Sequence, residues 1–257
     1  MLKDNFNRFF FAYSRYLQYD LIHSLEQETK IGRNVDLLLE FRDAFKVVIV
    51  EKDIDESKFD ELIDRIHQDI DNYIGDRKNE CLNLEVDKLK KSSFDYSLFD
   101  KDFKNVLSDF CVSCGDFKII DRIDHQGSQE FKKDKAGRSV LTQALLEFNN
   151  ALSHLLVCVY NGNDDLRNIE KAKNHLYRGT LDNYKMVFRF AINNIKKRDK
   201  TLFETFKQIR IYEFLNLGKN IHEKNIILKT ISAEPINIIG AYKELYNLSF
   251  GNQNFAN

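Results

Sequence analysis

Apolar residues recur every three or four positions along most of the chain, which is the spacing of one face of an α-helix. Phe6, Phe10, Tyr13 and Leu17 form the first such stripe. Eight stripes predict helices within residues 6–21, 38–48, 59–73, 99–110, 141–159, 165–197, 202–209 and 239–246. The pattern therefore predicts an all-α protein, built either as one multi-helix bundle or as two packed helical subdomains.

Residues that start or stop helices fall next to several of these stripes. Asp53 or Asp55 is placed to cap the helix at 59–73, and Gly75 is placed to end it in a left-handed conformation. Thr201 and Glu204 have the spacing of a capping box at the start of the seventh helix.

The apolar period fades between residues 115 and 137, where basic residues cluster. Such a polar stretch suits a connection between two helical bodies. We therefore expect an N-terminal helical subdomain at 1–115, a polar connection at 116–137 and a C-terminal helical subdomain at 138–257. The C-terminal subdomain should contain an αα-hairpin that turns near Gly162.

Composition agrees with a helical globular protein. The 257 residues are 43% hydrophobic and 31% charged, with ten glycines and one proline, too few turn residues for an all-β fold. The proline, Pro235, suits the first turn of the last helix. The formal net charge of -1 gives no global positive field, so nucleic-acid binding would need a local basic patch. The apolar runs are too short to cross a bilayer, so we expect no membrane partner.

Four cysteines raise the question of a disulfide or a metal site. A chain of this length needs no disulfide, and we expect reduced thiols in the cytoplasm. Cys111 and Cys114 have the Cys-x-x-Cys spacing of a zinc or redox pair. Only Cys81 and His125 could complete a zinc site, at spacings that match no common module, so Cys111 and Cys114 are weak metal candidates and we expect no cofactor. Packing of small apolar thiols is the favoured interpretation.

A row of ionisable residues follows one side of the helix at 165–197. Its members are His175, Arg178, Asp182, Lys185 and Arg189. In a cleft, His175, Arg178 and Asp182 would be catalytic candidates, because His titrates near neutrality and Arg can hold a phosphate or carboxylate. Lys185 and Arg189, with His154 and Asn150 on the preceding helix, would be binding candidates. A solvated face with helical ion pairs is the favoured alternative.

A basic helix with a histidine in a helical bundle is loosely similar to the HEPN superfamily of small helical nucleases and nucleotide-binding modules. The catalytic signature of that superfamily is an arginine, four to six other residues, and a histidine. This chain departs from it, because seven residues separate Arg167 from His175. The resemblance covers at most residues 138–198 and implies a HEPN-like scaffold that acts on RNA or a nucleotide through His175 and Arg178.

The leading functional hypothesis is a cytoplasmic interaction or regulatory protein that assembles with itself or with a larger protein partner. Phe9, Phe10 and Phe11 make the first helix apolar around much of its circumference, so Phe9 and Phe11 are either deeply buried or covered by a partner. The HEPN-like enzyme is the alternative. The Lys-, Asn-, Ile- and Phe-rich usage is compatible with a bacterial source and a role in defence.

Overall fold

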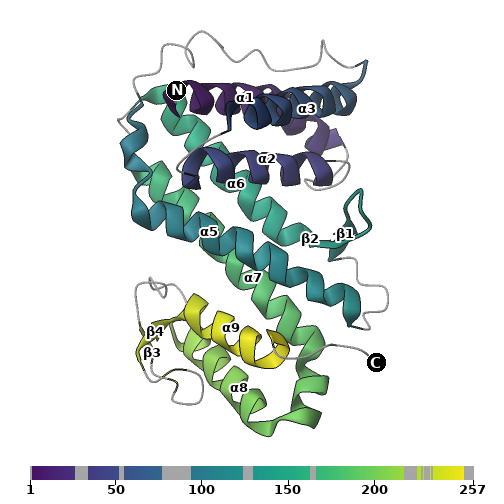
Figure 1. Cartoon of the computed structure of the whole chain (residues 1–257), viewed down its shortest axis with the longest axis vertical. Coiled ribbons are helices and arrows are strands. Elements are labelled where there is room, and N and C mark those ends of the chain that lie inside the picture. Colours follow the sequence, from purple (N-terminus) through teal and green to yellow (C-terminus); the bar gives the residue numbers. More distant parts are fainter. Residues whose placement is uncertain are drawn as a thin grey trace. The chain divides into compact units, whose positions relative to one another are not determined.

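The computed structural model describes residues 2–26, 34–51, 55–76, 94–123, 130–162, 166–216, 225–226, 228, 232 and 234–251. Within these residues the fold is all-α and contains eight α-helices, as predicted (Figure 1). The helices are α1 (Leu2–Glu26), α2 (Val35–Val50), α3 (Glu56–Ile74), α5 (Lys101–Asp116), α6 (Thr142–Asn161), α7 (Leu166–Arg198), α8 (Lys200–Leu215) and α9 (Ile238–Tyr246). None of these helices is both long and apolar enough to cross a bilayer.

Two small antiparallel hairpins accompany the helices. One pairs β1 (Phe131–Lys133) with β2 (Ser139–Leu141), and the other pairs β3 (Asn225–Ile226) with β4 (Ile236–Asn237). Short segments of 3₁₀ helix at Tyr96–Leu98 and Phe117–Arg122, and of π-helix at Asn247–Gly251, complete the described structure.

The chain forms two compact units, each made of two stretches of sequence. Unit 1 contains Met1–Val112 and Glu130–Gly179, and unit 2 contains Ser113–Gln129 and Thr180–Asn257. Helices α5 and α7 each contribute residues to both units. The predicted division of the chain at a connection in 116–137 stays a prediction, and residues 124–129 of that connection lie outside the described residues.

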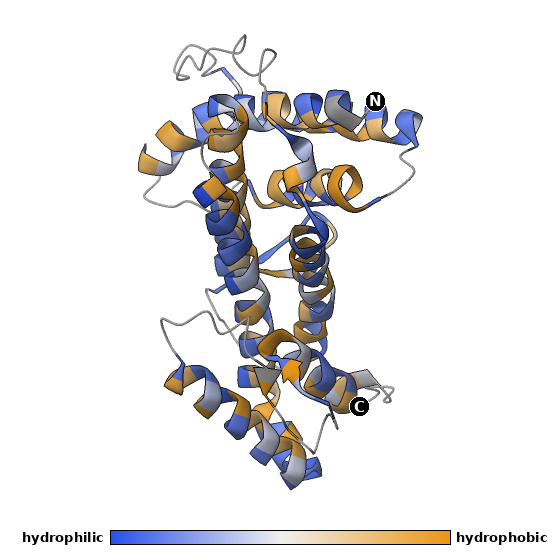
Figure 2. Ribbon diagram, turned by 90° about the vertical axis from the view of Figure 1, so that its left-hand side faces the viewer, coloured by the Kyte–Doolittle hydropathy of each residue, from blue (hydrophilic) through white to orange (hydrophobic). Residues whose placement is uncertain are grey.

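Aromatic side chains form the core of unit 1. Phe9 on α1 packs on Phe41 and Phe45 of α2, with ring centroids 5.8 Å and 5.2 Å apart. Phe45 also contacts Phe103 of α5 and Phe148 of α6. These rings are fully buried. The apolar stripes read from the sequence therefore face this core, and Figure 2 shows apolar and polar residues on different sides of the helices.

A buried carboxylate ties the first three helices together. Asp20 of α1 accepts hydrogen bonds from the Tyr73 hydroxyl of α3 at 2.9 Å and from Asn34 Nδ2, just before α2, at 3.1 Å. Asn34 Nδ2 also donates to the Tyr16 hydroxyl at 2.8 Å. Burial raises the pKa of Asp20 against the opposing effect of these hydrogen bonds.

The helix ends follow the sequence signals only in part. Asp55 caps α3 by accepting from the Lys58 amide, and Gly75 follows with the predicted positive φ of 58°, although its ψ of -135° lies outside the left-handed helical region. Asp199, rather than Thr201, caps α8, since its carboxylate accepts from two backbone amides of the first turn. Pro235 precedes β4 instead of opening α9, which Asn237 caps.

Unit 2 has an aromatic core of its own. Phe188 of α7 lies against Phe206 of α8, with ring centroids 5.3 Å apart, and against Tyr242 of α9 at 6.1 Å. Tyr184 of α7 stacks nearly parallel to Tyr242 and donates to Asp116 Oδ2 at 2.8 Å. These contacts join the second half of α7 to α8 and α9.

The β1–β2 hairpin is held against α2 and α3 through Lys135 at its tip. The Lys135 amide donates to Asp36 Oδ1 and its Nζ to Asp69 Oδ2, each at 2.7 Å. The carboxyl group of Asp69 lies near that of Glu40, and Arg65 Nε lies 3.3 Å from Glu40 Oε1. Burial and the neighbouring charge of Asp69 raise the pKa of Glu40 from 4.5 to about 7.

We expect Glu40→Gln to stabilise the protein at pH 8 and to have little effect at pH 4. The raised pKa means that stability present below pH 4.5 is lost as the pH rises through about 7, and the neutral amide avoids this loss. Because Arg65 and Lys135 are exposed to screening solvent, we expect a gain of only about 1 kcal/mol. Urea unfolding followed by circular dichroism measures it.

Glu61→Gln, on the exposed face of α3, is the matched control and should show no such pH dependence. Equal stabilisation by Glu40→Gln at both pH values would contradict the raised pKa of Glu40.

Candidate functional site

A buried carboxylate of α6 meets a histidine of α7 inside unit 1. Glu147 Oε2 lies 2.6 Å from His175 Nδ1, and the two side chains are only 10% and 15% exposed. Glu147 lies one turn after Gln143, whose Nε2 donates to Glu147 Oε1 at 3.1 Å. Both carboxylate oxygens therefore have donors.

The short contact fixes the tautomer of His175. A carboxylate can only accept, so Nδ1 carries a proton, and in the neutral form of the ring the lone pair is on Nε2. Nε2 of His175 has no partner within the described part of the chain. The arrangement has the form of a general base oriented by a carboxylate.

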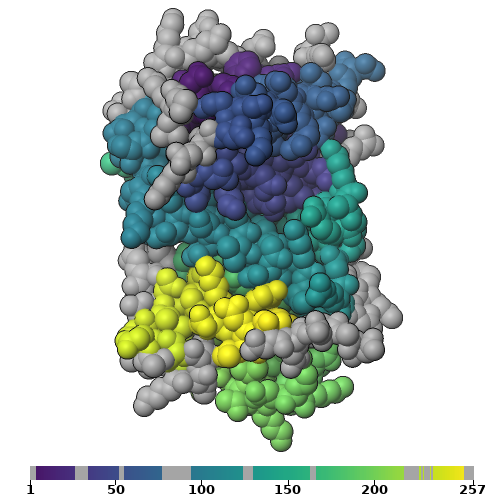
Figure 3. All heavy atoms as spheres, in the orientation of Figure 1, coloured from purple at the N-terminus to yellow at the C-terminus, as the bar shows by residue number. Residues whose placement is uncertain are grey.

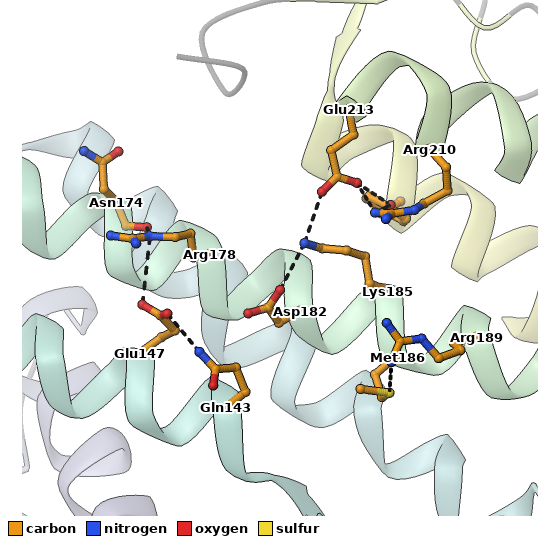
Figure 4. A network of polar contacts seen from close by, with 11 residues as sticks. Gln143, Glu147, Asn174, Arg178, Asp182, Lys185, Met186, Arg189, Arg210 and Glu213 are labelled. Atoms are coloured by element: carbon orange, nitrogen blue, oxygen red, sulfur yellow. Dashed lines mark hydrogen bonds and ion pairs between the residues drawn. The ribbon is translucent and has the colours of Figure 1, made fainter. Parts of the chain in front are cut away.

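Arg178 lies beside this pair on the next turn of α7. Its Nε is 3.9 Å from Glu147 Oε2 and donates to the backbone carbonyl of Asn174 at 3.3 Å (Figure 4). The side chain is 57% exposed, and its two terminal nitrogens make no hydrogen bond to another described residue. The guanidinium is therefore oriented on one side and open to an anion on the other.

His154 of α6 stacks on His175, with ring centroids 5.2 Å apart and an angle of 23° between the rings. Its Nδ1 is 2.9 Å from Asn168 Oδ1. Burial lowers the pKa of His154 against the opposing effect of this hydrogen bond, so the ring is neutral at pH 7. Asn150, one turn before His154, is half-buried and has no hydrogen-bond partner among the described residues.

The rest of the predicted row lies in unit 2, where most of its charges are paired. Lys185 Nζ is 3.0 Å from Asp182 Oδ1 and 3.1 Å from Glu213 Oε1. Glu213 also accepts from Arg210 and, at 3.0 Å, from the Tyr242 hydroxyl. Figure 4 shows this network and the Arg189 side chain, whose Nη1 is 3.8 Å from Met186 Sδ.

The structure thus brings His175 and Arg178 together with Glu147, which the sequence analysis did not select. A signal for it was present, because Glu147 is the single Asp, Glu, Lys or Arg in the 20 residues of α6. A lone carboxylate in an otherwise uncharged, apolar helix has to find a partner when it is buried. The sequence could not show that this partner is His175.

The cysteine candidates form no metal centre in the described residues. Cys158 is buried, Cys111 and Cys114 are half-buried, and Cys114 Sγ accepts from Asn183 Nδ2 at 3.5 Å. No group of three or more His, Cys, Asp or Glu side chains suited to a metal occurs in the ranges that the structure describes. Cys81 and His125 lie outside those ranges.

The N-terminal phenylalanines are mostly core residues. Phe9 and Phe10 are fully buried in unit 1, so Phe9 is not a contact surface. Phe11 is half-buried, with its ring centroid 6.0 Å from that of His67 on α3. Of the two interpretations of this cluster, deep burial is the one that the structure gives for Phe9.

Comparison of the chain with models of protein families, with curated proteins and with solved structures finds no match. The site therefore has to be interpreted from its own geometry.

A glycine on α7 lets Glu147 lie this close to the helix that carries His175. A Cβ atom added to Gly179 would lie 2.7 Å from Phe110 Cε2 and 3.4 Å from Glu147 Cβ. Phe110 cannot turn away easily, because it is fully buried and stacks on Phe148 with centroids 5.6 Å apart. Gly179 is therefore required by packing.

We expect Gly179→Ala to destabilise the protein. Overpacking costs about 1–3 kcal/mol, whereas the better helix propensity of alanine returns about 1 kcal/mol. Gly115→Ala is the matched control, since it is also helical but exposed and has nothing within 4 Å of the added atom. Thermal unfolding should give a lower Tm for the first variant and an equal or higher Tm for the second. A Gly179→Ala variant that is more stable than wild type would show that the Phe110 ring can move to make room for the added methyl group.

Proposed function

We propose that the chain acts on a phosphate ester of a nucleotide or of RNA, with His175 as the acid–base group and Arg178 as the phosphate-binding group. The observation that carries the proposal is the 2.6 Å contact between Glu147 and His175 next to an exposed guanidinium. A histidine near an arginine in a helical bundle also suits the HEPN-like interpretation, although Arg178 follows the histidine instead of preceding it.

In this proposal His175 Nε2 removes the proton from a hydroxyl group that attacks phosphorus. As the new P–O bond forms, the ester P–O bond to the leaving oxygen breaks, and the imidazolium of His175 returns the proton to that oxygen. Glu147 accepts from Nδ1 throughout, so it holds the ring in place and stabilises the imidazolium that forms. Arg178 donates to the phosphate oxygens through its terminal nitrogens, where negative charge increases during the attack. His154 and Asn150 lie on the same side of α6 and contribute polar groups for the rest of the ligand.

The proposal uses only unit 1. Lys185 is paired with Asp182 and with Glu213, so we assign Asp182 and Lys185 a structural role in unit 2. A chain of 257 residues needs no disulfide for stability, and we expect the chain to act in the cytoplasm.

We expect His175→Ala to lower turnover of a short RNA by about 10²–10⁴-fold, the usual contribution of a general acid–base group. Arg178→Ala should mainly weaken binding of RNA or AMP, since a charged hydrogen bond contributes about 1.5–3 kcal/mol. Gel-resolved cleavage and fluorescence anisotropy measure the two effects separately.

Arg189→Ala is the matched control, because it removes an arginine from the same helix but from unit 2. If wild-type protein neither binds nor converts RNA or AMP, the proposal fails. Loss of activity in the control equal to that in Arg178→Ala would also contradict it.

A second candidate function is assembly with another copy of the chain. Ile211, Phe214 and Leu215 on the last turns of α8 are large apolar residues that are 56%, 71% and 66% exposed. Such a patch is typical of an interface, and a twofold dimer would cover it with the same patch of a second copy.

We expect Phe214→Glu to shift an oligomer to monomer in native mass spectrometry without lowering the Tm, since the side chain is mostly exposed. Leu166→Glu, at another exposed apolar position, should leave the oligomeric state unchanged. A monomeric wild-type protein would exclude this second candidate.

A further inference from the structure

A cavity of about 260 Å³ lies in unit 1 between α2, α3 and the tip of the β1–β2 hairpin. Its lining residues are Asp36, Leu37, Asp69, Asn72, Tyr73 and Lys135. In the space-filling view the hairpin, coloured teal, lies beside α2 (Figure 3). The cavity is separate from the His175 site and has no part in the proposed function.

Two carboxylates and one ammonium group determine the charge of this cavity. Lys135 Nζ is 2.7 Å from Asp69 Oδ2, yet 64% of the Lys135 side chain is exposed. Asp36 accepts only from the Lys135 backbone amide, so no side-chain cation is hydrogen-bonded to it within the described residues. The hairpin backbone is held at this point, whereas the ammonium group is on a flexible side chain that can leave.

Leu37 and Tyr73 give the cavity apolar and aromatic surface. Tyr73 is fixed because its hydroxyl donates to the buried Asp20 at 2.9 Å and its ring packs against Tyr16 with centroids 5.8 Å apart. Leu37 adds an aliphatic side chain. A fixed aromatic ring beside carboxylates favours an organic ammonium ion, because the ring face attracts cations and contacts methylene groups.

We propose that this cavity binds a small aliphatic diamine and that the ammonium group of Lys135 occupies part of the site in the free chain. Two positive charges match Asp36 and Asp69, and a short carbon chain fits between them against Leu37 and Tyr73. The ligand replaces Lys135 at Asp69, and the hairpin stays attached through its backbone contact with Asp36.

Isothermal titration with 1,4-diaminobutane tests the proposal on the full chain. A tethered competitor acts at a high effective concentration, so Lys135→Ala should bind the diamine about tenfold more tightly than wild type. Lys132→Ala removes an exposed lysine from the same hairpin and should bind like wild type. Asp69→Asn and Asp36→Asn should each lose binding, with circular dichroism confirming that they fold.

The uncharged analogue 1,4-butanediol should not bind. The proposal is overturned if neither wild type nor Lys135→Ala binds the diamine, or if Lys135→Ala binds no more tightly than Lys132→Ala. Binding of Ca²⁺ but not of the diamine would also overturn it, since the cavity would then be a metal site.

Discussion

The geometry of the candidate site depends on the close approach of α7 to α6 and α5 at Gly179. The position that a Cβ would take is already within 3.4 Å of Phe110 and Glu147. His175 lies one turn earlier on the same side of α7, so the missing side chain also brings His175 within hydrogen-bond distance of Glu147. Any larger residue at 179 would either displace the buried Phe110 or separate the two helices. The polar pair is thus a consequence of apolar packing.

Two buried carboxylates of unit 1 show how a structural acid differs from a candidate functional one. Asp20 accepts from neutral donors, the hydroxyl of the half-buried Tyr73 and the amide of the buried Asn34. Such an acid holds helices together, since all its donors in these contacts come from neighbouring elements of unit 1. Glu147 instead has partners that carry or exchange charge, His175 and Arg178, and one of these reaches solvent. Burial does not distinguish Glu147 from Asp20, because both acids are nearly fully buried. The difference lies in their hydrogen-bond partners.

The helices were predictable from the sequence because the apolar period persists over several turns in each of them. The two hairpins were not, since strands of two or three residues are too short to show alternation. The capping-box spacing points to Thr201 as the cap of α8, whereas Asp199 caps it in the structure. Asp199 lies at the end of a run of charged residues, so in the sequence it looks like an ordinary exposed residue. Periodicity also placed His175 and Arg178 on one side of a helix. It could not identify the helix that faces them, and so the pairing with Glu147 needed the fold.

Because the net charge is -1, the chain as a whole does not attract a phosphate. Where a phosphate can bind therefore depends on which Lys and Arg side chains are paired with carboxylates. In unit 2, Lys185 and Arg210 both contact Glu213, and Lys185 also contacts Asp182, so two carboxylates balance these two cations. In unit 1, Arg178 and Lys171 both lower the pKa of His154, and Glu147 contacts His175 and lies 3.9 Å from Arg178. Two cations therefore lie near the stacked histidines, although the chain as a whole is slightly acidic. This placement of cations beside His175 is what supports the phosphate chemistry proposed for this face of α7.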